Sequence, residues 1–178
     1  MRLETDQLLI RPWRKDDREP FAKINADAAV RRYYYPAILT RAESDEVIDQ
    51  CTEHLNAHGF AFLALERRND RKLIGGAGLS MTNDIPGGPR VEIGWILGSS
   101  YWRQGYAKEA SRAWLSHAWA KGLPEIVGYT SASNAPSRAL MKSLGMSHDA
   151  ADDFADPTVP PDNPLSPHVL FTIQRPYF

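Results

Sequence analysis

A strand, a tight turn and the start of a helix follow one another between residues 91 and 110. Gly105 and Ala107 fall in the expected first turn of the helix, with the basic residues Arg103 and Lys108 beside them. The first N–H groups of a helix have no partner inside it and carry partial positive charge, so small residues there let a pyrophosphate approach the backbone. The pattern predicts an anion site. A turn that binds nothing, in which Gly105 only relieves crowding, remains the alternative.

Two common phosphate-binding signatures do not occur in the sequence. A P-loop requires Gly-x-x-x-x-Gly-Lys-Ser/Thr, and a dinucleotide fold requires Gly-x-Gly-x-x-Gly before a helix. The segment Gly76-Ala-Gly78 is only a fragment of the second motif, and no helix is expected after it. The predicted anion site is therefore of another kind.

A second informative stretch runs from Thr130 to Met146. Ser133 or Asn134 can cap a helix that begins near Pro136, because these side chains accept hydrogen bonds from free helical N–H groups and proline suits the first turn. Capping and core packing account for this stretch without any function.

Together the two stretches resemble the GNAT acyltransferases, and most closely their RimJ/RimL-like branch. The segment Trp102-Arg-Gln-Gly-Tyr-Ala107 is similar to the family's pyrophosphate motif, Gln/Arg-x-x-Gly-x-Gly/Ala, although Trp102 departs from its first position. The segment 92–97 is similar to the strand that pairs with the pantetheine arm of the cofactor. The segment from Asn134 to Met146 is similar to the closing motif, whose Asn contacts the cofactor, and 165–171 resembles the ending of the branch.

The resemblance covers nearly the whole chain and implies one domain over residues 1–178 of the mixed α/β (α+β) class. The implied fold is a mostly antiparallel twisted sheet, splayed at the cofactor site and flanked by about four helices. The implied activity is transfer of an acetyl group from acetyl-CoA to a primary amine by direct attack in a ternary complex, without a metal ion. The residues that the resemblance assigns to the cofactor are Trp95, Ile96, Leu97, Arg103, Gln104, Gly105, Tyr106, Ala107, Lys108, Asn134, Ser137 and Arg138.

Glu92 is the first candidate for the base that takes the proton of the attacking amine. A free alkyl amine has a pKa of about 10, so the ammonium must lose a proton before it attacks. Glu92 begins the strand that should carry the thioester, on the face opposite Ile93 and Trp95. A solvated or ion-paired strand glutamate is the alternative. The rival bases are His148, Asp152, Asp153 and His168.

Many members of the family place a tyrosine acid seven residues after the closing Asn, and Met141 occupies that position here. The resemblance implies that Ser137, one turn after Asn134, supplies the hydroxyl that helps the thiolate to leave. Ser137 is equally acceptable as a residue of the helix surface, as are Arg138 and Lys142.

The run Tyr33-Tyr34-Tyr35, beside Arg31 and Arg32, falls where the family forms one wall of the acceptor cleft. Packing between two helices is the alternative. The residues expected to bind the acceptor are Tyr33, Tyr34, Tyr35, Glu92 and His168. The acceptor itself, a protein N-terminus or a small-molecule amine, stays open. A non-catalytic acyl-CoA-binding regulator also stays open, because Met141 replaces the usual tyrosine.

Hydrophobic periodicity and turn residues predict the elements that would position these side chains. Strands are expected at 7–13, 60–66, 72–81, 91–97, 126–131, 146–154 and 168–174. Helices are expected at 16–26, 40–59, 103–121 and 136–144. Thr40 with Glu43 forms a capping box for the second helix and Gly59 ends it. The strands at 60–66 and 72–81 should form a hairpin.

The composition excludes several classes of protein. Lys plus Arg number 21 and Asp plus Glu 22, a net charge of -1 that argues against nucleic acid or an anionic membrane as partner. Cys51 is the single cysteine, so no disulfide within the chain is possible and the cytoplasm is the expected location. Trp13, Trp119 and the proline-rich loop at 156–167 are candidates for covering a homodimer interface.

Overall fold

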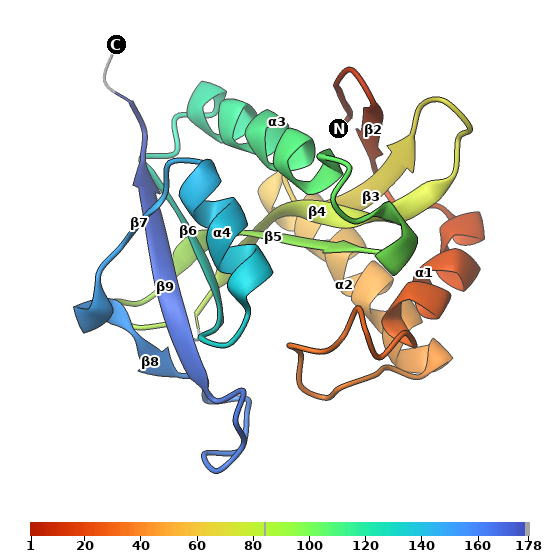
Figure 1. Ribbon diagram of the computed structural model, residues 1–178. Coiled ribbons are helices and arrows are strands. Elements are labelled where there is room, and N and C mark those ends of the chain that lie inside the picture. The colour runs from red at the N-terminus through yellow and green to blue at the C-terminus, as the bar shows by residue number, and fades with distance from the viewer. Residues whose placement is uncertain (84, 177–178) are drawn as a thin grey trace.

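One open sheet organises the molecule (Figure 1), whose computed structural model describes residues 1–83 and 85–176. Within these residues nine strands run in the order β1-β2-β3-β4-β5-β6-β9-β7, with β8 paired to β9. All neighbouring strands are antiparallel except β5 and β6. The expected fold class is confirmed. The strands are β1 (Leu3–Glu4), β2 (Leu8–Arg11), β3 (Phe62–Arg67), β4 (Leu73–Thr82), β5 (Arg90–Leu97), β6 (Glu125–Ser131), β7 (Ser147–His148), β8 (Phe154–Ala155) and β9 (Pro167–Gln174).

The sheet opens between β5 and β6. These parallel strands share one register pair in the described chain, Glu92 with Val127. On its other edge β5 pairs with β4 from Arg90 to Leu97, and β6 pairs with β9 along its whole length. Beyond Glu92 the edge of β5 that faces β6 therefore has no strand partner among the described residues, which leaves backbone N–H groups there for another molecule.

Helices cover both faces of this sheet. α3 (Tyr106–Ala120) lies on one face of β4 and β5, while α1 (Arg18–Asn25) and α2 (Arg41–His58) lie on the other (Figure 1). α4 (Ala135–Ser143) packs beside β6 and β9. Trp114 anchors α3: it is fully buried, and its Nε1 donates to the carbonyl oxygen of Ala77 at 3.0 Å.

Local sequence signals set the ends of two helices as predicted. The Thr40 side chain accepts from the N–H of Glu43, whose carboxylate accepts from the N–H of Thr40 at 2.7 Å, and Gly59 ends α2 with φ of 74°. Asn134 caps α4, because its Oδ1 accepts from the N–H of Ser137 at 3.3 Å. These caps fix the place of the closing motif relative to β6.

The start of α3 differs from the prediction, which began the helix at residue 103. A short 3-10 helix (Ser99–Tyr101) comes first, and α3 begins only at Tyr106. Arg103 and Gly105 both have left-handed backbones, with φ of 58° and 87°. A left-handed residue cannot continue a right-handed helix, so Arg103 and Gln104 belong to the turn before it.

The strand predicted at 146–154 is wrong as a continuous element. β7 and β8 are two residues each, and a 3-10 helix (Ala150–Asp152) separates them. The side chain of Asp149 accepts from the N–H of Ala151 at 3.0 Å and thereby favours a turn over a strand.

The two tryptophans considered for a dimer interface are partly buried and pack against the core. Trp13 packs against Phe21 with ring centroids 4.5 Å apart, and its Nε1 donates to the carbonyl oxygen of Phe62 at 2.9 Å. Trp119 is partly buried against the main core. Across residues 1–83 and 85–176, the helices are all too short or too polar to cross a bilayer.

Candidate functional site

A cavity of about 580 Å³ lies between the turn before α3, the end of β5 and the start of α4. Of the residues assigned to a cofactor from the sequence, those that line it are Trp95, Ile96, Leu97, Arg103, Gly105, Tyr106, Ala107, Lys108, Asn134 and Ser137. Three segments that are far apart in the sequence thus line the same cavity. We call it the first cavity.

Gly105 gives the first cavity a set of backbone donors. It is the N-cap of α3, and no side chain of the described residues caps the helix there. The first N–H groups of a helix lack intrahelical acceptors, so those after Gly105 suit an anion. A Cβ built on Gly105 would meet nothing within 4 Å, which shows open space beside the turn. The site therefore fits the pyrophosphate of a coenzyme A.

Two assigned residues turn away from this cavity. Gln104 donates through Nε2 to the carbonyl oxygen of Ser100 at 2.9 Å, and Arg138 donates through Nη1 to the carbonyl oxygen of Ala132 at 2.8 Å. Neither is among the residues that line it. Both side chains stabilise turns beside the site rather than facing into it.

Trp95 lies where the unpaired edge of β5 begins to open. Its carbonyl oxygen accepts from the hydroxyl of Tyr34 at 3.2 Å. In an extended strand the N–H and C=O of one residue point to the same edge. We therefore expect the Trp95 N–H to face the opening, where it can meet a carbonyl oxygen of a bound molecule.

Two further cavities lie next to the first. The second, of about 260 Å³, shares Tyr34, Trp95, Asn134 and Ser137 with the first. The third, of about 440 Å³, shares Tyr34 and Trp95 with both and lies against α2 and the start of β5. The three cavities are therefore neighbours around Tyr34 and Trp95, and their linings together reach from the start of α3 to Glu92.

A known family accounts for this arrangement: the model of the acetyltransferase (GNAT) domain matches residues 7–147. The chain belongs to the GNAT acetyltransferases. Among curated proteins, an FsC-acetyl coenzyme A-N(2)-transacetylase of Aspergillus fumigatus is 40% identical over 60 residues, which is 33% of this chain and 26% of that protein. An uncharacterized N-acetyltransferase p20 of Bacillus licheniformis is 27% identical over 145 residues, 80% of each chain.

Solved structures agree on the fold. A GNAT-family acetyltransferase from Bacillus anthracis superposes with a TM-score of 0.79 at 20% identity, covering 98% of this chain and 99% of that one. RimL, a ribosomal L7/L12 alpha-N-protein acetyltransferase solved with coenzyme A, superposes with a TM-score of 0.78 at 11% identity, covering 98% of each. At these identities the likeness establishes the fold of this acetyltransferase.

Glu92 of this acetyltransferase lines the third cavity. Its Oε1 accepts from the hydroxyl of Ser80 at 2.9 Å, across the β4–β5 pair. Burial raises the pKa of the Tyr129 phenol, and the neighbouring charge of Glu92 raises it further. The hydroxyl groups of Ser80 and Tyr129 therefore lie near the Glu92 carboxylate, at the point where β5 and β6 begin to separate.

His168 lies in the second cavity, but its ring nitrogens are engaged. Nδ1 lies 3.1 Å from the carbonyl oxygen of Ser166, and Nε2 lies 3.4 Å from the Asp156 carboxylate. The ring also packs against Phe154 at 5.7 Å. Both ring nitrogens thus lie next to groups of the protein itself, which favours a role for His168 in shaping the second cavity.

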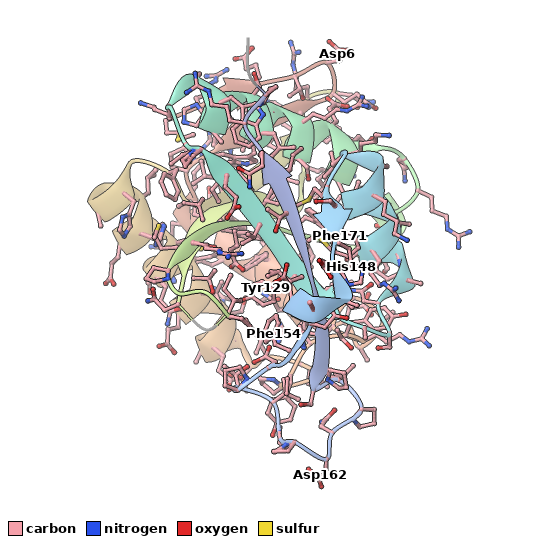
Figure 2. The ribbon with its side chains drawn as sticks, turned by 90° about the vertical axis from the view of Figure 1, so that its left-hand side faces the viewer. Asp6, Tyr129, His148, Phe154, Asp162 and Phe171 are labelled. Atoms are coloured by element: carbon pink, nitrogen blue, oxygen red, sulfur yellow. The ribbon has the colours of Figure 1, made fainter. Side chains whose placement is uncertain are left out.

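The other rival bases lie outside the three cavities. His148 is 2.8 Å from the Asp153 carboxylate and stacks on Phe171 at 5.0 Å. Figure 2 shows His148 beside Phe171, and Tyr129 beside Phe154, near β9. Asp152 belongs to the 3-10 helix between β7 and β8. The position of these residues favours Glu92 as the base.

Ser137 lies at the junction of the first and second cavities, one turn into α4. Met141, at the position of the family's usual tyrosine, also borders the second cavity and is 1% exposed. A buried thioether has no proton to give, so Ser137 is the hydroxyl that α4 offers at this point.

The tyrosine run lines the cavities. Tyr33 borders the first and second cavities, Tyr34 borders all three, and Tyr35 borders the second. The sequence did not single out Tyr129 or His54, which also line the third cavity. Tyr129 is two residues after Val127, the pairing partner of Glu92, but that pairing is not visible in the sequence.

No group of three or more His, Cys, Asp or Glu side chains suited to a metal ion occurs among the residues described.

Proposed function

We propose that this acetyltransferase moves an acetyl group from acetyl-CoA to a primary amine by direct attack, with both substrates bound together. The observation that carries the proposal is the set of three neighbouring cavities. Their linings together reach from the backbone donors of α3, past the unpaired edge of β5, to Glu92. Such an arrangement holds a long cofactor at one end and an amine at the other, and proximity of the two is worth up to about 7–11 kcal/mol.

Each part of the chain then has one task. The N–H groups after Gly105 hold the pyrophosphate, and the Trp95 N–H donates to the thioester oxygen as that oxygen gains charge. Glu92 takes the amine proton, directly or through water, as the nitrogen bonds to the acetyl carbon. The C–S bond breaks, and the hydroxyl of Ser137 donates to the departing thiolate.

Cys51 supports direct attack over transfer through an acetylated cysteine. It is the single cysteine of the chain and borders the third cavity. Burial raises the pKa of its thiol to about 12. The thiolate is the nucleophilic form of cysteine, so Cys51 is almost entirely unreactive at neutral pH.

The finer assignments rest on the sequence. The RimJ/RimL-like branch is proposed from its sequence motifs, with a likeness in fold to RimL. Residence in the cytoplasm remains a prediction from cysteine usage, and a homodimer remains a prediction without a defined interface. A non-catalytic acyl-CoA-binding regulator is disfavoured by the placement of Glu92 and Ser137 among these cavities.

The test is to mix the protein with acetyl-CoA and a panel of amines, and to follow free thiol. We expect thiol release that depends on the amine and yields the N-acetyl product by mass spectrometry. The panel includes amino acids, amino-acid amides, polyamines and peptides with free N-termini. Coenzyme A binding by calorimetry without amine-dependent thiol release would instead favour the regulator.

Replacing Ser137 with alanine tests the leaving-group role. A hydrogen bond to a developing thiolate exists only in the transition state, and one to a charged group is worth about 1.5–3 kcal/mol. We expect kcat to fall about 10- to 100-fold while KM for acetyl-CoA changes little. Ser143→Ala, on the exposed side of the same helix, is the control. Equal turnover in wild type and Ser137→Ala would remove Ser137 from the reaction.

A further inference from the structure

Arg31 is a buried cation that forms no close ion pair within the described chain, where the carboxylate of Glu43 acts on its charge only at longer range. It is 8% exposed, and its Nη2 donates to the carbonyl oxygen of Pro36 at 2.9 Å. Its guanidinium carbon lies 4.6 Å from the centroid of the Tyr34 ring. Its Nε is buried and has no hydrogen-bond partner among these residues. A buried charge is stable when it is paired, so this guanidinium is suited to an anion that arrives from outside.

Arg31 lines the third cavity, the one that also contains Glu92. It is the only described residue of that lining with a permanent positive charge. His54, in the same lining, has its pKa lowered by burial and by His58, and its Nε2 accepts from the N–H of Met81 at 3.3 Å. The cavity therefore holds one fixed cation, Arg31, and one carboxylate, Glu92.

Tyr34 is close enough to both charges to be influenced by each. Burial raises the pKa of its phenol, the charge of Arg31 lowers it, and the charge of Glu92 raises it. Its ring packs against the guanidinium while its hydroxyl donates to β5. A molecule in this cavity thus meets both a cation and a carboxylate near Tyr34.

We propose that the acceptor is a small primary amine that also carries a carboxylate, which Arg31 binds while the amine lies toward Glu92. The inference rests on the proposed acetyl transfer and adds the chemical class of the acceptor. A planar guanidinium recognises a carboxylate with short, charge-assisted hydrogen bonds. A polyamine offers Arg31 only positive charge, so it is disfavoured here.

The experiment compares each of a series of α- and ω-amino acids with its own carboxamide, which keeps the shape and removes the negative charge. For the wild-type protein we expect kcat/KM to favour at least one acid over its amide by about 10- to 100-fold. In Arg31→Gln that preference should vanish because the acid loses rate, while the amide keeps its rate. Arg31→Lys should retain part of the preference.

Arg41→Gln is the matched control, because it removes the same charge from an exposed residue of α2 that pairs with Asp45. It should keep the wild-type preference. Coenzyme A affinity by calorimetry verifies that each variant is folded. Amides acetylated as fast as acids by the wild type, or an unchanged preference in Arg31→Gln, would overturn the inference and leave acetyl transfer intact.

A binding measurement separates this inference from the proposed function. The protein is saturated with coenzyme A and titrated in a calorimeter with the best amino acid and, separately, with its carboxamide. We expect tighter binding of the acid than of the amide, although no acetyl transfer can occur. Arg31-dependent binding of the acid without turnover on any amine would refute the proposed transfer and retain the site. Turnover on polyamines or peptide N-termini alone would refute the site and retain the transfer.

Discussion

Replacing Glu92 with glutamine is expected to lower kcat/KM for the amine by about 10²- to 10⁴-fold, the usual contribution of one acid–base group. Glutamine keeps the shape of the side chain and can still accept from Ser80, but it cannot take a proton. Binding of acetyl-CoA should survive, since Glu92 lines the third cavity and not the first.

The pH dependence gives an independent check on Glu92. A carboxylate base is inactive once it is protonated, so the acidic limb of the profile of kcat/KM should flatten or shift in Glu92→Gln. Glu125→Gln removes an equal charge from β6 beside Arg90 and should change neither rate nor profile. The variant His168→Ala is measured alongside Glu92→Gln, because His168 is a rival candidate for the base. If the larger loss falls on His168, or if Glu92→Gln keeps a normal profile, then Glu92 is a structural residue of the strand.

Replacing Gly105 with valine is expected to weaken coenzyme A binding by about 100-fold or more. The left-handed backbone at Gly105 allows the chain to present its N–H groups to the phosphates. A valine would place its branches in the open space where the phosphates approach. It would also disfavour the backbone conformation by about 1–2 kcal/mol. Hydrogen bonds to charged phosphate oxygens are worth about 1.5–3 kcal/mol each, so losing one or two of them gives an effect of this size.

Gly59→Val is a matched control for this effect. Gly59 also has a left-handed backbone, with φ of 74°, and a Cβ there would likewise meet nothing within 4 Å. It lies at the end of α2, away from the first cavity. Both variants should lose a similar amount of thermal stability, measured by melting, while calorimetry should show lost affinity only in Gly105→Val. Wild-type affinity in a folded Gly105→Val protein would exclude the phosphate role.

Local signals predicted the parts of the fold that depend on a few neighbouring residues. The capping box at Thr40, the glycine stop at Gly59 and the Asn134 cap involve partners within four residues of one another. The β3–β4 hairpin was likewise predicted from two apolar runs and the turn between them, and its antiparallel pairing is confirmed. Such features are readable because their energetics are local.

Other parts depend on contacts that a single sequence does not display. The left-handed backbone at Arg103 places the start of α3 later in the chain than predicted. An arginine in the sequence does not indicate such a backbone. Ser80 and Tyr129 come to Glu92 through strand pairing across β4, β5 and β6. Arg31 was noted only as a neighbour of the tyrosines, since nothing local indicates that its charge is buried. The long-range pairing of the sheet decides these positions.

The single register pair between β5 and β6 has a consequence for how this molecule can move. The strands β4 and β5 are held together by antiparallel hydrogen bonds, and so are β6 and β9. In the described chain these two halves of the sheet are joined at the pair Glu92 and Val127. A small tilt of one half against the other displaces atoms in proportion to their distance from that meeting point. Glu92 then moves least, while α4, carrying Asn134 and Ser137, moves farther. The proposed base therefore lies at the point where the two halves of the sheet join, and both halves help to hold it in place.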